Sequence, residues 1–177
     1  MVYLIKKEKT MIGLAIAIIV FNFIAFKTNK RLTANQILHI WMFTIAFQHM
    51  FDVFIDLKYH AYWYFTENAD WRGVLTHTVL LPPANMIFLN WYPFKMSIIH
   101  KGCYFIFWMV AILLYEMITL LPEPWGYFHY GWWNLWYSAI IDPVLLLIAL
   151  GYYKWVVKLE NRLFPLIVDE VLVFLLL

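Results

Sequence analysis

Residues 98–121 read IIHKGCYFIFWMVAILLYEMITLL, and this stretch decides the fold. About 20 mostly apolar helical residues cross the roughly 30 Å hydrocarbon core of a bilayer, and 98–121 is longer than that. Backbone polar groups find no water inside lipid, so the segment must satisfy them internally as an α-helix. Four other apolar stretches follow the same pattern: 11–26, 35–57, 73–94 and 132–157. The sequence therefore predicts an all-α integral membrane bundle of five transmembrane helices.

The composition agrees with a lipid environment. The chain of 177 residues is 64% hydrophobic and 14% charged, whereas soluble domains average about 45–50% apolar and about 25% charged residues. Its length leaves room for one transmembrane domain, 1–177. The formal net charge is only +2 and the basic residues are spread along the chain, so we expect no nucleic-acid partner. Cys103 is the only cysteine, which excludes an internal disulfide.

Local signals mark where the helices begin and bend. Thr33 is a suitable N-cap for the helix 35–57. The pair Pro82-Pro83 falls inside 73–94, and Pro143 falls inside 132–157. Each proline leaves the carbonyl four residues earlier without its helical donor. We therefore expect the helix 132–157 to be interrupted, and the freed carbonyls to find other partners or to line a cavity.

The C-terminal stretch 163–177 is apolar but short. It contains Asp169 and Glu170, which are costly inside a bilayer. The stretch is therefore predicted to form a short interfacial or docking helix and not a sixth span.

The distribution of Lys and Arg predicts the orientation. Cytoplasmic loops carry an excess of positive charge. An outside N-terminus places eight Lys or Arg residues on the cytoplasmic side and five on the outer side. Three lysines before the first helix, at positions 6, 7 and 9, favour the opposite orientation. The prediction is an outside N-terminus and a cytoplasmic C-terminus in the cell membrane.

The outer loops are aromatic. Residues 125–137 read WGYFHYGWWNLWY, in which eight of thirteen are Trp, Tyr or Phe. Residues 62–65 and Trp71 are expected on the same side. Trp and Tyr prefer the headgroup region of a bilayer, so these loops predict an interfacial belt; a platform for a lipid or sugar headgroup is the alternative.

Ionisable side chains at membrane depth are the candidate functional residues, because they are costly in lipid and normally face a partner or a cavity. A rise of about 1.5 Å per residue places four of them at similar depth in the outer half of the bundle. These four candidate metal ligands are His49, Asp52, His77 and Glu116. Four more residues complete the predicted polar layer: Asp56, Asn85, Asn134 and Asp142.

Three functions are compatible with this layer. Two imidazoles and two carboxylates suit a divalent metal ion, which would activate water in a membrane-embedded hydrolase. Carboxylates along a polar path would suit a small proton-coupled transporter. Alternatively, the side chains form a network that fixes helix packing or receives a partner, either a second copy or another membrane subunit. The sequence favours this structural or partner-binding role, although the excess of acids over buried bases counts against a purely structural network.

Two segments carry a resemblance to other proteins. Residues 33–65 read TANQILHIWMFTIAFQHMFDVFIDLKYHAYWYF, and residues 120–143 read LLPEPWGYFHYGWWNLWYSAIIDP. This pattern resembles small multi-pass membrane proteins of endospore-forming bacteria, a group with no assigned function. The resemblance covers roughly 30–153. It implies a bacterial cytoplasmic membrane and nothing about chemistry.

Overall fold

The computed structural model describes residues 11–176 except positions 69 and 123, with side chains as far as Arg162. Lys6, Lys7 and Lys9, which oppose the predicted orientation, lie outside the described residues. The chain is mostly helical, and its helices and strands follow in this order: α2 (Ile12–Lys27), α3 (Ala34–Asp52), the π-helix η1 (Val53–Lys58), β1 (Tyr62–Tyr64), α4 (Trp71–Leu75), the π-helix η2 (Thr76–Leu80), α5 (Leu81–Trp91), α6 (Ile98–Thr119), β2 (Phe128–Tyr130) and α7 (Leu135–Leu176). The predicted helical fold is confirmed.

Three helical segments of the described chain are long and apolar enough to cross a membrane: Ala34–Lys58, Ile98–Thr119 and Leu135–Arg162. The first predicted span is the 16-residue helix α2. The third predicted span is a composite of α4, η2 and α5. The prediction of a membrane bundle is supported by these helices, and the number of five spans stays a prediction.

Helix α3 begins as its sequence predicts. The Thr33 hydroxyl accepts a hydrogen bond from the Gln36 backbone N–H at 3.2 Å, and the Gln36 side chain accepts one from the Thr33 N–H at 3.3 Å. This reciprocal pair satisfies two backbone donors that a helix N-terminus leaves unpaired.

The carbonyls freed by Pro82 and Pro83 find partners on neighbouring helices. The indole N–H of Trp41 in α3 donates to the Thr78 carbonyl at 2.8 Å, and the Asn22 amide in α2 donates to the Val79 carbonyl at 2.8 Å. The prolines occupy the first turn of α5, where a missing N–H costs little. These two hydrogen bonds at the proline pair therefore connect α2 and α3 to η2.

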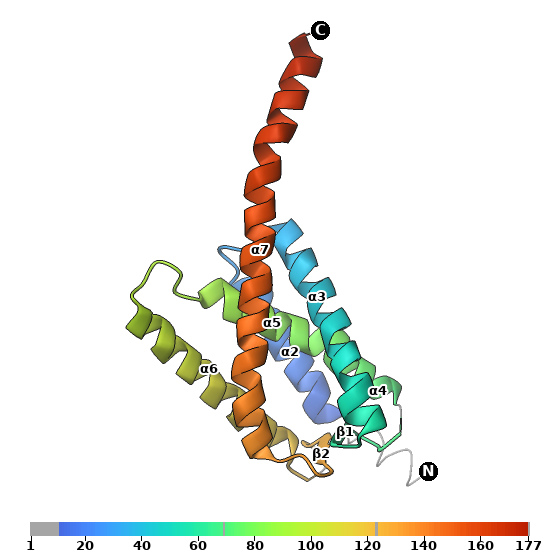
Figure 1. Ribbon diagram of the computed structural model, residues 1–177. Coiled ribbons are helices and arrows are strands. Elements are labelled where there is room, and N and C mark those ends of the chain that lie inside the picture. The colour runs from blue at the N-terminus through green and yellow to red at the C-terminus, as the bar shows by residue number, and fades with distance from the viewer. Residues whose placement is uncertain (1–10, 69, 123, 177) are drawn as a thin grey trace.

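Helix α7 differs from its prediction. It starts at Leu135, passes Pro143 without a break and runs on to Leu176, so the predicted interruption and the separate short helix 163–177 are absent from its backbone. One proline removes one helical hydrogen bond, and a helix with good flanking turns can continue through it. Figure 1 shows α7 extending past the rest of the bundle.

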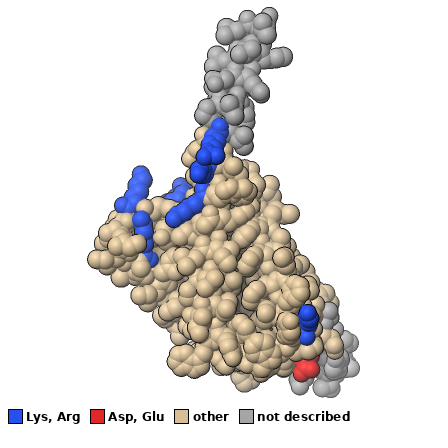
Figure 2. All heavy atoms as spheres, viewed as in Figure 1, with Lys and Arg blue, Asp and Glu red and all other residues tan. Residues whose placement is uncertain are grey.

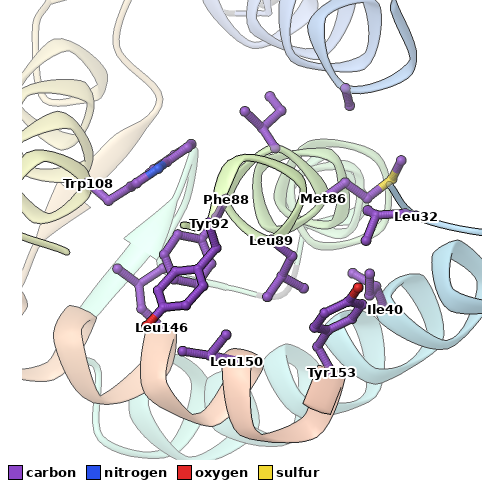
Figure 3. Close-up of a cluster of buried hydrophobic side chains, with 12 residues drawn as sticks. Leu32, Ile40, Met86, Phe88, Leu89, Tyr92, Trp108, Leu146, Leu150 and Tyr153 are labelled. Atoms are coloured by element: carbon purple, nitrogen blue, oxygen red, sulfur yellow. The ribbon is translucent and has the colours of Figure 1, made fainter. Parts of the chain in front are cut away.

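The core surrounds α5. Phe88 and Met86 are fully buried, and Phe88 packs edge-to-face on Trp108 of α6 with ring centroids 5.7 Å apart. Figure 3 shows Leu150 and Tyr153 of α7 on another side of α5, with Ile40 of α3 beside them. Helix α5 is thus enclosed by the longer apolar helices, which expose large apolar side chains on their outward faces.

A two-stranded antiparallel sheet lies across one end of the bundle (Figure 1). Its register pairs Tyr62 with Tyr130, Trp63 with His129 and Tyr64 with Phe128. The strands come from the two aromatic loops, which confirms that these loops lie at the same end. The strands themselves were not expected, since three-residue segments that pair across more than sixty positions leave no local pattern. We call this sheet the tyrosine lid.

Candidate functional site

Each strand of the tyrosine lid holds one carboxylate of the bundle. The Tyr62 hydroxyl donates to Asp52 Oδ1 at 2.6 Å, and the Tyr130 hydroxyl donates to Glu116 Oε1 at 2.6 Å. Burial raises the pKa of both tyrosines well above the usual value, and the nearby carboxylates raise it further. Both hydroxyls therefore stay protonated at neutral pH and act as hydrogen-bond donors.

Asp52 also pairs with His77 across two helices. Asp52 Oδ2 lies 2.5 Å from His77 Nε2, and both residues are about 94% buried, with relative exposures of 6% each. Gln48 donates to Asp52 Oδ1 at 3.2 Å. The edges of the His49 and Tyr64 rings contact His77 at centroid distances of 5.3 and 5.1 Å. The predicted buried layer is thus present in part, as this Asp52–His77 pair.

Two π-helices shape the backbone around the pair. Asp52 immediately precedes η1, which carries Asp56, and η2 carries His77. A π-helix adds a residue per turn to a helix, and such turns are frequent at functional sites. Because both segments widen at the same place, the side chains that face one another there leave space between them.

That space is a cavity of about 180 Å³, which we call the histidine cavity. Its walls include His49, Asp52, Asp56 and His77. Asp56 Oδ1 is buried and has no hydrogen-bond partner among the described residues. Asp70 also lines the cavity and forms an ion pair with Arg72, whose guanidinium lies 4.5 Å from the centre of the Phe65 ring.

Glu116 belongs to a second group. Its Oε1 accepts from Tyr130 and, at 2.6 Å, from the Ser138 hydroxyl of α7. Ser138 in turn accepts from the Trp133 indole N–H at 2.9 Å. These bonds join α6, β2 and the start of α7 into one polar unit.

Two further cavities adjoin at Asp142. The lid cavity, about 180 Å³, is lined by Tyr62, Tyr64, Glu116 and Asp142 among others. The core cavity, about 220 Å³, reaches deeper between α3, α5, α6 and α7 and is also lined by Asp142. They share seven lining residues: Gln48, Leu80, Leu81, Ile112, Tyr115, Asp142 and Leu145. The two cavities adjoin along these walls, and we call them together the cleft; both are largely apolar, with Glu116 on the wall of the lid cavity and Asp142 on the walls of both.

The candidate residues from the sequence divide between these places. Of the four candidate metal ligands, His49, Asp52 and His77 line one cavity and Glu116 lies in the other group. Within the described residues, no cluster of three or more His, Cys, Asp or Glu side chains is placed to hold a metal ion.

The rest of the predicted polar layer is also divided. Asp56 lines the histidine cavity, and Asp142 lines the cleft. Asn85 donates to the Thr44 hydroxyl at 3.0 Å in the core cavity. Asn134 is exposed, and its side chain accepts from the Trp136 N–H at 3.0 Å, so it caps α7 and does not enter the layer.

The residues that the sequence did not identify are Tyr62, Tyr130 and Ser138. The tyrosines belong to aromatic loops whose composition predicts a belt at the membrane interface. Nothing in their spacing distinguishes a residue of such a belt from a tyrosine that donates a hydrogen bond to a carboxylate. Comparison with known proteins adds no assignment: no family model, curated protein or solved structure matches the chain.

Proposed function

We propose that this membrane protein binds a small organic cation with an apolar body in the cleft formed by the lid and core cavities. Glu116 and Asp142 recognise the charge, and the aromatic walls of the core cavity hold the apolar part. The protein would act as a binding subunit in a bacterial cytoplasmic membrane, with the tyrosine lid outside and the C-terminal end of α7 inside.

The observation that carries this proposal is a pair of carboxylates without a positive partner. Glu116 and Asp142 line the cleft. Of the described residues that line its two cavities, none is Lys, Arg or His. A carboxylate left without a positive partner in a low-dielectric site is costly, and a bound cation would offset that cost.

Asp142 is the best placed of these groups for a ligand. Its Oδ2 is buried without a hydrogen-bond partner in the described structure. It lines both cavities, where the two adjoin. A cation bound there would have an anionic partner at one end and apolar walls at the other.

The walls favour an organic cation over a hydrated inorganic ion. Phe43, Phe47, Phe88 and Trp108 line the core cavity. Aromatic faces attract ammonium groups by about 0.5–2 kcal/mol and more strongly where water is excluded. A pocket that is largely apolar with a few convergent polar groups is the usual form of a small-molecule site.

The three functions considered from the sequence predict different binding behaviour of the purified protein. A network that only fixes packing predicts no saturable ligand. Proton coupling predicts proton uptake by Asp142 without an organic ligand. A metal-dependent hydrolase predicts stoichiometric binding of Zn²⁺ that depends on His49 and His77.

The test is equilibrium binding to the full chain in lipid nanodiscs, read by tryptophan fluorescence. The probe is benzyltrimethylammonium, and neopentylbenzene is its uncharged isostere. We expect saturable binding of the cation only, weakened about tenfold or more in Asp142→Asn and Glu116→Gln, because the quaternary ammonium donates no hydrogen bond and each variant removes one of the two negative charges that attract it. Glu67→Gln, at an exposed loop position, is the matched control and should bind as the unmodified protein does. Equal binding of the isostere, or no saturable binding of either probe, would overturn the proposal.

A further inference from the structure

The end of the bundle opposite the tyrosine lid carries a different pocket. It has a volume of about 430 Å³ and is lined by Arg31, Lys95 and Lys154, with Phe94, Tyr153 and Val157 among the remaining walls. Figure 2 shows Lys and Arg side chains gathered at this end of the molecule, near the point where α7 leaves the bundle. We call it the basic pocket.

The three positive charges come from three separate segments. Arg31 follows α2, Lys95 lies between α5 and α6, and Lys154 belongs to α7. Their convergence is therefore a property of the fold and not of a local run of basic residues. No Asp or Glu appears among the described residues that line the pocket.

Arg31 is held in a fixed position. Its guanidinium donates to the Tyr92 carbonyl at 2.7 Å and lies 4.8 Å from the centre of the Phe94 ring. Buried Asn90 secures the preceding turn, because its side-chain oxygen accepts from the backbone N–H groups of Lys30 and Arg31 at 3.1 and 3.2 Å. The amide of Asn90 also donates to the Thr28 carbonyl at 2.8 Å. A preorganised guanidinium loses little side-chain entropy when it binds an anion.

Glu160, an acid on α7 near this end, forms hydrogen bonds with the start of α3. The Glu160 carboxylate accepts from the amides of Asn35 at 2.6 Å and Gln36 at 2.5 Å, at the start of α3. Its hydrogen bonds are to neutral amides, and it is not among the residues that line the basic pocket.

We propose that the basic pocket binds the phosphate headgroup of an anionic membrane lipid, with an acyl chain lying against Phe94 and Val157. A phosphodiester accepts hydrogen bonds from Arg and attracts Lys as a point charge. Basic pockets between transmembrane helices bind anionic headgroups at the cytoplasmic leaflet. Cytoplasmic loops are also enriched in Lys and Arg, so the proposed site agrees with the predicted cytoplasmic position of this end.

The test is a lipid titration of the purified full chain in detergent, followed by native mass spectrometry. Phosphatidylglycerol and phosphatidylcholine with the same acyl chains are the two lipids. We expect at least tenfold tighter binding of phosphatidylglycerol, and at least a tenfold loss of that binding in the double variant Lys95→Gln with Lys154→Gln. Arg31 is left unchanged because its bond to the Tyr92 carbonyl supports the fold.

The control pair removes the same charge from outside the pocket: Lys27→Gln with Lys101→Gln should change the affinity less than threefold. Equal loss in both pairs would overturn the site, since the effect would then come from the overall charge. Equal binding of the two lipids would also overturn it. Displacement of the lipid by sn-glycerol 3-phosphate at equal concentration would overturn the membrane lipid as the source of the phosphate.

Discussion

Tyr62 and Tyr130 face each other across the two-stranded sheet, and each donates a 2.6 Å hydrogen bond to a carboxylate on a different helix. One register pair thereby holds Asp52 at the end of α3 and Glu116 near the end of α6. The two loops lie far apart in the sequence and pair to form the tyrosine lid. The positions of both carboxylates therefore depend on this lid and not on their helices alone.

The tyrosine bonds should therefore contribute to stability. Tyr62→Phe removes the donor to Asp52 and leaves the ring in place. Hydrogen bonds to charged groups contribute about 1.5–3 kcal/mol, so the free energy of unfolding in detergent should fall by about that amount. Tyr59→Phe, at a tyrosine with 53% exposure, is the control and should change it by less than about 0.5 kcal/mol. Equal effects of the two variants would show that the bond to Asp52 carries no stability.

The Asp52–His77 pair should behave as a coupled unit. Removing one member of a buried ion pair costs about 3–5 kcal/mol because the other is left uncompensated. Asp52→Asn and His77→Gln should each be strongly destabilising, and the double variant should cost much less than the sum of the two. A double-mutant cycle on unfolding free energies measures this. Additive costs would mean that the two side chains do not interact.

Gly131 should be required for the tyrosine lid. A Cβ at this position would lie 2.1 Å from the His60 carbonyl oxygen, which is backbone and cannot move aside. Gly131→Ala should therefore separate β1 from β2 and lower the free energy of unfolding by an amount typical of overpacking, about 1–3 kcal/mol, which a lower unfolding midpoint would report. Gly102→Ala on α6 is the matched control, because its Cβ would meet nothing within 4 Å. An unfolding midpoint for Gly131→Ala at or above that of Gly102→Ala would contradict the register described above.

The hydrogen bonds to the carbonyls freed by the proline pair should contribute to stability. Trp41→Phe keeps an aromatic ring but removes the N–H that pairs with the Thr78 carbonyl. Hydrogen bonds between membrane helices contribute about 0.6 kcal/mol on average and up to about 1.7 kcal/mol. The free energy of unfolding should therefore decrease by an amount in that range. Trp155→Phe, at an exposed position on α7, should have no effect. A fall of the same size in Trp155→Phe would mean that the loss reflects the indole ring and not the carbonyl bond.

Depth along the helices could be predicted from the sequence, but rotation about their axes could not. A rise of 1.5 Å per residue places Asp52, His77 and Glu116 at similar depth, and the structure does pair Asp52 with His77. Glu116 meets Tyr130 and Ser138 instead, because the face that α6 turns inward is set by tertiary packing and not by its own periodicity.

Helix starts and proline effects were predictable to different degrees. The Thr33 cap follows from local chemistry and is confirmed. The apolar run from Trp132 predicts a helix that contains Asn134, yet α7 begins at Leu135 and Asn134 caps it. The freed Thr78 and Val79 carbonyls could be foreseen, whereas their donors on α2 and α3 depend on how three helices pack.

The most direct test of the central claim, a cation site in the cleft, is ligand protection of a cysteine placed in its wall. Ala111 lines the core cavity and Cys103 is exposed, so the protein carries Ala111→Cys with Cys103→Ser. The rate of modification of the new thiol by a methanethiosulfonate reagent is measured with and without benzyltrimethylammonium. We predict at least fivefold slower modification with the cation, no protection by neopentylbenzene, and loss of protection when Asp142→Asn is added. A rate that the cation leaves unchanged, or protection that survives Asp142→Asn, would contradict the claim.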